Sequence, residues 1–247
     1  MKTSTSFNFG LSMAVGSVLL TSALSASAGV PGKVQKNANN ITSAAAQAVI
    51  VKPQPVVPAN QKALGYSLWD MANATAHFNT GDRCAPPPET PFKLLVTCGD
   101  PPYKFEVKDG TMFYIPVFNL DDSPPAVGTF PDVRDKLDLN SYVYSMNQVG
   151  TVYAMISVDG WHYLLNKNYL AGVDVWPPLP DGGGTRYATV AAFLKPLSKG
   201  YHTIEISAML AGKELKPWCE VINGIYGFTV CKDLYDFKIT YEVNVVE

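Results

Sequence analysis

Three histidines, His77, His162 and His202, are the residues best suited by type to acid–base or metal chemistry. No two of them have the HxH or HExxH spacing that places two imidazoles on one zinc ion. His202 is in phase with Ile204 in a predicted strand, so we expect a buried, hydrogen-bonded structural side chain. The histidines therefore predict no zinc centre.

The motifs of nucleophilic catalysis are missing from the sequence. It has no GxSxG elbow and no SxxK motif with SDN and KTG partners. Gly182, Gly183 and Gly184 lack the lysine of a phosphate-binding loop, so we interpret the segment after Asp181 as a flexible turn. Sequence alone does not place two carboxylates at the spacing that glycoside hydrolysis needs.

Four aspartates flank a proline-rich stretch, where their oxygens could gather around calcium. They are Asp121, Asp122, Asp132 and Asp135. Their spacing does not match an EF-hand, and a solvated acidic loop is the simpler interpretation. Calcium at these four residues is the one cofactor that the sequence suggests, and the leading expectation is no cofactor.

Two tryptophans beside turns are candidate ligand-binding residues. Trp161 follows the Asp159-Gly160 turn with His162 next to it, and Trp176 precedes two prolines. Exposed aromatic faces can stack on sugar rings, which makes Trp161, His162 and Trp176 the predicted binding residues. The simpler interpretation, which we prefer, is that the tryptophans fill the ends of the core.

Four cysteines predict two disulfides rather than a metal or redox site, because no CxxC spacing occurs. Among the three pairings we favour Cys84 with Cys98 and Cys219 with Cys231, since each closes a short ring.

The second of these pairings predicts a hairpin over residues 219–231. Asn223-Gly224 favours a two-residue turn, but that turn would place another residue opposite the first cysteine. The pairing therefore needs a wider loop centred on Ile225 or a bulge at Gly227.

The N-terminal residues have the three parts of a secretory signal peptide. Lys2 gives the positive start, residues 11–20 are an apolar run, and Ala26, Ser27 and Ala28 form a small-residue ending. We expect cleavage of residues 1–28 and a secreted or periplasmic protein. The apolar run is too short to span a bilayer, and no later run is long enough, so no membrane span is expected after cleavage.

Residues 29–62 contain no aromatic residue and predict a flexible, partly extended linker before a domain at 63–247. The chain is 47% apolar and 16% charged, which excludes wholesale disorder, collagen and coiled coil. Of the 19 basic residues, five lie before Ala63, which leaves 14 against 21 acidic residues in the domain. This negative charge predicts no binding of nucleic acid.

Helical spacing predicts one short helix near residues 64–75 and a second near 133–146. Stretches rich in β-branched and aromatic residues predict strands elsewhere, with hairpins over 152–165 and 187–208. The alternation from Tyr235 to Val245 predicts a half-buried last strand. Together these patterns predict a mainly β fold, a two-sheet antiparallel β-sandwich (jelly-roll-like) with one or two short helices.

Several short segments from Ala63 to Glu247 have a familiar pattern. They are Trp69, Thr80-Gly81-Asp82-Arg83-Cys84, the strand Met112 to Asn119, Val158-Asp159-Gly160, Leu194 to Ile206 and Tyr241-Glu242-Val243. In these segments the chain resembles a family of exported bacterial proteins without an assigned function. The resemblance implies a bacterial secreted β-sandwich and brings no catalytic residues.

We therefore expect an exported, non-enzymatic binding or interaction protein. The sequence does not identify its ligand, and a glycan and an envelope protein are the candidate partners. A secreted hydrolase acting on cell-envelope or extracellular glycans is the second hypothesis, and it predicts a cleft with two converging carboxylates or a histidine pair. A cell-envelope structural component that associates through an edge strand is the third.

Overall fold

The computed structural model describes residues 54–226, 231 and 233–247. The predicted signal peptide and residues 29–53 of the predicted linker lie outside these residues. Of residues 54–62, also assigned to the linker, residues 55–57 pack on the domain. Val56 and Val57 are buried, and the Val57 N–H donates to the Phe193 carbonyl at 2.9 Å. The folded part therefore begins before Ala63.

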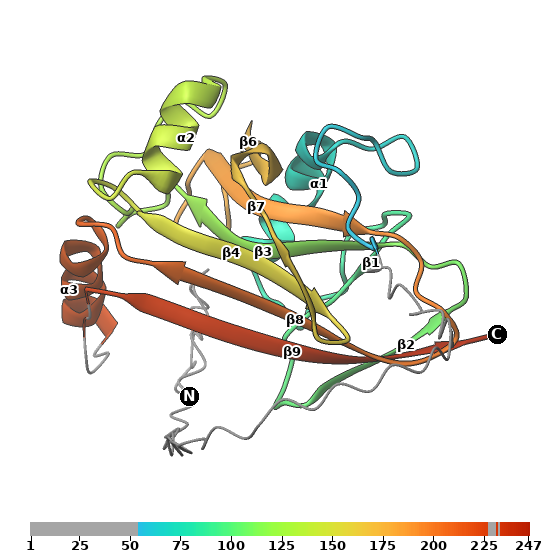
Figure 1. Cartoon of the computed structure of the whole chain (residues 1–247). Helices are drawn as coiled ribbons and strands as arrows, with labels where there is room; N and C mark the ends of the chain where they lie inside the picture. Colours follow the sequence, from blue (N-terminus) through green and yellow to red (C-terminus); the bar gives the residue numbers. More distant parts are fainter. Residues whose placement is uncertain (1–53, 227–230, 232) are drawn as a thin grey trace, which may run out of the picture. The chain divides into compact units, whose positions relative to one another are not determined.

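The described residues form nine strands and three α-helices (Figure 1). In chain order they are α1 (Leu68–Thr80), β1 (Lys93–Leu94), β2 (Tyr103–Lys108), β3 (Phe113–Asp121), α2 (Lys136–Tyr144), β4 (Thr151–Val158), β5 (Trp161–Leu164), the 3-10 turn η1 (Lys167–Tyr169), β6 (Leu170–Asp174), β7 (Arg186–Leu194), β8 (Gly200–Leu210), α3 (Leu215–Tyr226) and β9 (Tyr235–Val246). One sheet has the order β1-β3-β7-β6 and the other β2-β9-β8-β4-β5. The predicted mainly β fold with two sheets is confirmed.

Two details differ from the expected antiparallel arrangement. Strand β1 pairs with β3, and β2 with β9, in parallel, so each sheet is mixed. Parallel neighbours need a long connection, and β2 with its flanking loops lies between β1 and β3 in the chain. The second difference is a third helix, α3, where the sequence predicts one or two.

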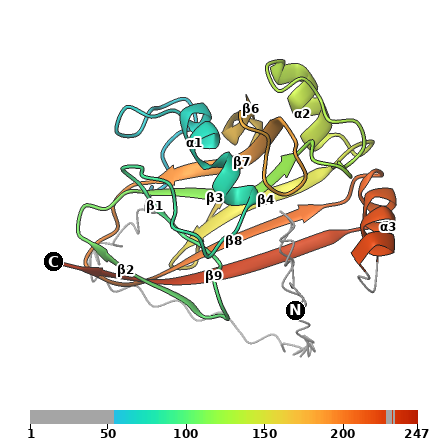
Figure 2. The same cartoon turned by 180° about the vertical axis from the view of Figure 1, so that it is seen from behind.

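The four-stranded sheet carries apolar side chains on both faces, and each face packs against another part of the domain. Its inner face meets the five-stranded sheet in a core that includes Phe113, Ile115 and Ile204. Its outer face carries Tyr114 and packs under α1, which covers β6 and β7 (Figure 2). Burial on both sides accounts for the nearly continuous apolar sequences of β3 and β7.

Local contacts fix both ends of α1. Ser67 and Asp70 form a capping box, in which the Ser67 N–H donates to Asp70 at 2.8 Å and the Asp70 N–H donates to Ser67 at 3.2 Å. The helix ends at Gly81, where a Cβ atom would lie 2.7 Å from the His77 carbonyl oxygen. Asn79 and Arg83 are thereby placed at the opening between the sheets.

One predicted hairpin is confirmed and another is wrong. Strands β4 and β5 pair across Asp159 and Gly160, both of which have positive φ angles. The hairpin over 187–208 does not form, because β7 pairs with β3 and β6 while β8 pairs with β4 and β9. With apolar residues on both faces, β7 takes a central place in the doubly covered sheet.

The hairpin predicted over residues 219–231 is also wrong. Leu215, Trp218, Cys219 and Ile222 recur at helical spacing, and residues 215–226 form α3. Leu215, Cys219 and Ile222 are buried, and the Trp218 Nε1–H donates to a backbone carbonyl at 2.8 Å. The bulge expected at Gly227 lies outside the described residues.

Both predicted disulfides are confirmed. The Cα atoms of Cys84 and Cys98 are 5.0 Å apart, and those of Cys219 and Cys231 are 5.5 Å apart. Within the described residues, no helix is long and apolar enough to cross a membrane.

Candidate functional site

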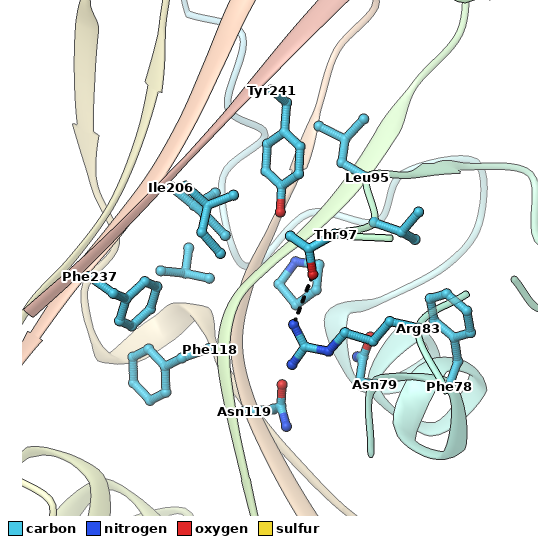
Figure 3. A pocket seen from close by; sticks show the side chains of 14 residues that line it. Phe78, Asn79, Arg83, Leu95, Thr97, Phe118, Asn119, Ile206, Phe237 and Tyr241 are labelled. Carbon is cyan, nitrogen blue, oxygen red and sulfur yellow. Dashed lines mark hydrogen bonds between the residues drawn. The ribbon is translucent and has the colours of Figure 1, made fainter. Parts of the chain in front are cut away.

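A pocket opens between the two sheets, where the end of α1 and the loop closed by the Cys84–Cys98 disulfide meet them (Figure 3). Its volume is about 70 Å³, enough for several waters or a small ligand group. One wall is apolar and the other polar. The lining residues are Phe78, Asn79, Arg83, Leu95, Val96, Thr97, Pro116, Val117, Phe118, Asn119, Ile206, Phe237, Ile239 and Tyr241.

The apolar wall comes from three strands. Phe118 lies on β3, Ile206 on β8, and Phe237 and Ile239 on β9 (Figure 3). The two β9 residues occupy inward positions but are only half-buried, whereas Val243 further along the strand is fully buried. The open pocket accounts for this difference.

The polar wall centres on Arg83. Its Nη1 donates to the Thr97 hydroxyl at 3.2 Å, and Asn119 lies beside the guanidinium (Figure 3). No carboxylate in the described part of the chain forms an ion pair with Arg83. Asn119 is 8% exposed, and its Nδ2 has no hydrogen-bond partner there. The wall therefore presents a cation with no carboxylate among its described lining residues, the pattern that suits an anion.

Tyr241 adds a phenol to the same wall. Burial raises the pKa of Tyr241, and nearby Arg83 offsets this only in part. The hydroxyl therefore stays protonated, and it points toward Thr97 and the guanidinium (Figure 3). A neutral phenol beside a cation can donate a further hydrogen bond to an anion.

The Cys84–Cys98 disulfide positions this wall, because Arg83 and Thr97 each precede one of the two cysteines. Sequence reasoning singled out neither residue as functional. A signal was nevertheless present, since pairing the two cysteines implies that their neighbours approach one another.

The four aspartates named as calcium candidates have separate roles. The Asp122 carboxylate accepts a 2.8 Å hydrogen bond from Arg186 Nε, Asp132 accepts from a nearby backbone N–H, and Asp135 caps α2. Among the described residues, no group of three or more His, Cys, Asp or Glu side chains is placed to hold a metal ion. Local turns and Arg186 bind these carboxylates separately, and calcium at the four residues remains a prediction.

Asp121 instead meets Asp181, which the sequence analysis left in a turn. Ser123 donates to both carboxyl groups, from its N–H to Asp121 and from its hydroxyl to Asp181, each at 2.9 Å. Burial, together with the Asp181 charge, raises the pKa of Asp121 to about 6. Burial also raises the pKa of Asp181. The two carboxyl groups therefore favour sharing a proton.

The glycine run after Asp181 is docked rather than a free turn. A Cβ atom at Gly182 would lie 2.8 Å from the Ser123 Cβ, and one at Gly184 would lie 2.6 Å from the Ser123 nitrogen. The Gly184 N–H also donates to the Ser123 hydroxyl at 3.1 Å. Glycine is needed here for close approach, which corrects the interpretation as a flexible turn.

The predicted aromatic binding residues lie on different sheets. Trp161 and His162 are in β5 of the five-stranded sheet, whereas Trp176 follows β6 of the four-stranded sheet. None of the three lines the cavities found in the described residues. Trp176 is 84% exposed, so it does not fill the end of the core. Binding at these residues remains a prediction.

His202 contacts Asp159 and Ser198, the residue types of a catalytic triad, but the geometry is not that of a triad. Its Nδ1 lies 2.7 Å from Asp159, and its Nε2 lies 2.7 Å from the Ser198 carbonyl and 3.4 Å from the Ser198 hydroxyl. Burial opposes a charged ring, but the bonds to Asp159 and Ser198 raise the pKa of His202. Since Nε2 donates to a carbonyl, it is not a base for the serine. The predicted structural role of His202 fits these contacts.

The fold and pocket thus define a mainly β protein of two mixed sheets with a small pocket between them. No protein-family model, curated protein or solved structure matches the chain. The resemblance to exported bacterial proteins therefore remains a prediction.

Proposed function

We propose that the protein is an exported, non-enzymatic binding protein whose pocket between the sheets takes a small amphipathic anion. The anionic group pairs with Arg83, and the apolar part lies against Phe118, Ile206 and Phe237. The observation that carries this proposal is a half-buried arginine with no carboxylate partner among the described residues. A guanidinium in such a setting binds a carboxylate through charge-assisted hydrogen bonds.

Export is supported by two disulfides, which form in oxidising compartments, and by the predicted signal peptide. Binding is preferred to the hydrolase hypothesis because no carboxylate among the described residues lines the Arg83 pocket. Asp121 and Asp181 line a separate cavity of only about 60 Å³, where Ser123 donates a hydrogen bond to each of them.

The test compares hexanoate with hexanamide, which has the same chain but no charge. Binding is measured by isothermal titration calorimetry to the protein and to its Arg83→Met variant. We expect hexanoate to bind at least about tenfold more tightly than hexanamide, because a charge-assisted hydrogen bond contributes about 1.5 to 3 kcal/mol. Arg83→Met should remove this preference.

Lys213→Met is the matched control, since it removes one exposed positive charge away from the pocket. It should leave hexanoate binding unchanged. Equal binding of acid and amide, an unchanged Arg83→Met variant, or no hexanoate binding at all would each contradict the proposal.

A further inference from the structure

A second cavity shares no lining residue with the Arg83 pocket. Three segments form it: the loop at residues 58–60, the first half of α2 and the turn at residues 166–170. Its volume is about 510 Å³, within the range of about 300 to 1,000 Å³ typical of small-molecule sites. We call it the asparagine groove.

Asn60, Asn140, Asn166 and Asn168 line the groove, which is four of the 14 asparagines in the whole chain. The Asn166 Oδ1 accepts a hydrogen bond from the Asn168 N–H at 2.9 Å, so this oxygen is used within the turn. The side chains of the other three form no hydrogen bond with the described part of the chain. A side-chain amide both donates and accepts, which matches the hydroxyl groups of a sugar.

Two lysines give the groove a positive charge. Lys136 and Lys167 line it, no carboxylate does, and neither lysine is ion-paired within the described residues. Asp135, next to Lys136, accepts hydrogen bonds from the first N–H groups of α2. The domain as a whole is acidic, but these two lysines make the groove a local site of attraction for anions.

Apolar side chains complete one wall. Leu139 and Leu170 are among the lining residues, together with Tyr169. The Tyr169 hydroxyl donates to the Val57 carbonyl at 3.2 Å, which fixes the ring. Such a wall can contact the apolar face of a pyranose ring while polar groups reach its hydroxyls.

We propose that the asparagine groove binds an acidic oligosaccharide. The amides hydrogen-bond the ring hydroxyls, Lys136 and Lys167 pair with carboxylates, and the Tyr169 wall contacts the sugar rings. An acidic peptide would satisfy the lysines but would bring no hydroxyl groups to the amides.

The probe is tetragalacturonate, compared with neutral maltotetraose and with tetraglutamate, and binding is measured by calorimetry on the whole mature chain. We expect tetragalacturonate to bind at least about tenfold more tightly than either control, and more weakly as salt increases. The double variant Lys136→Met/Lys167→Met should lose at least about tenfold in affinity, and Asn60→Ala/Asn168→Ala several-fold.

The matched control Lys195→Met/Lys213→Met removes the same charge outside the groove and should bind as the parent does. Arg83→Met should also leave tetragalacturonate binding unchanged, which separates this inference from the proposed function. Equal binding of maltotetraose or of tetraglutamate would overturn the inference. So would the absence of tetragalacturonate binding, or full affinity in the groove variants.

Discussion

Arg186 and Arg83 are both half-buried arginines beside β-strands, but their partners differ. Arg186 donates to Asp122 at 2.8 Å and to two backbone carbonyls, and its guanidinium lies 5.5 Å from the Phe130 ring centre. Within the described residues, Arg83 donates to the Thr97 hydroxyl alone. Arg186 uses its Nε and Nη1 to join a carboxylate to two loop carbonyls, so it holds loops together. Arg83 has no carboxylate partner in the described part of the chain and faces an open pocket, which suits a ligand.

Replacing Arg186 should have the largest effect on stability. Arg186→Met leaves the Asp122 carboxylate, which is 12% exposed, without its cation. Because Arg186 itself is 35% exposed, we expect a loss of about 3 kcal/mol in the free energy of unfolding, at the lower end for a broken buried pair.

Urea unfolding measures this loss, and Arg83→Met is the matched control. That variant should lose less than about 1 kcal/mol, because a single hydrogen bond is removed. If the two variants were equally destabilised, the distinction between a structural and a ligand-binding arginine would fail.

Asp121 and Asp122 extend the comparison to two neighbouring carboxyl groups. Asp122 pairs with Arg186, whereas Asp121 has no arginine partner among the described residues. The pKa of Asp121 is raised in the folded state to about 6, so the folded protein binds the proton more tightly than the unfolded chain. The resulting stabilisation is present below pH 3.8 and is lost as pH rises through about 6. Its size is on the order of 3 kcal/mol.

Asp121→Asn keeps the acceptor for the Ser123 N–H and cannot ionise. Urea unfolding from pH 4 to pH 7 should show the variant gaining stability relative to the parent as pH increases. A constant difference between the two proteins across this range would contradict the shared proton.

The two disulfides provide a similar contrast between the pocket and a distant region. Cys84→Ser/Cys98→Ser should cost about 2 to 3 kcal/mol of stability and also weaken hexanoate binding, because Arg83 and Thr97 lose their fixed positions. Cys219→Ser/Cys231→Ser should cost a similar amount without changing hexanoate affinity. Unfolding and calorimetry on both variants test this, and equal effects on affinity would argue against a positioning role.

The sequence predicted elements whose burial follows one simple period. The alternation in β9 and the turn at Asp159-Gly160 identified their strands correctly. Strand β7 is apolar on both faces, so its pattern does not say which strands it joins. Residues 215–226 carried two signals, a hairpin turn and a helical apolar stripe, and packing of the stripe on the core prevailed.

The candidate sites depend on long-range contacts that periodicity does not encode. Asp121 and Asp181 are 60 positions apart in the sequence, and only the docking of the glycine loop on Ser123 brings them together. Arg83 is distinguished by the lack of a carboxylate partner in the part of the chain that the structure describes, which is visible only in three dimensions. The predicted Cys84–Cys98 pairing was the single feature that could have indicated its surroundings.

The conservative variant Arg83→Lys should have the smallest effect and gives the finest test of the comparison. Lysine keeps the positive charge, but it lacks the planar fork that holds a carboxylate with two hydrogen bonds. We expect hexanoate affinity to fall about fivefold, less than in Arg83→Met, since the loss of one charge-assisted hydrogen bond is partly offset by the remaining ammonium. Calorimetry measures the affinity, and an unchanged urea midpoint shows that the fold is intact.

If Arg83→Lys bound hexanoate as tightly as the parent, a point charge would suffice and the guanidinium geometry would have no role. If it bound as weakly as Arg83→Met, the fixed geometry would account for the whole effect.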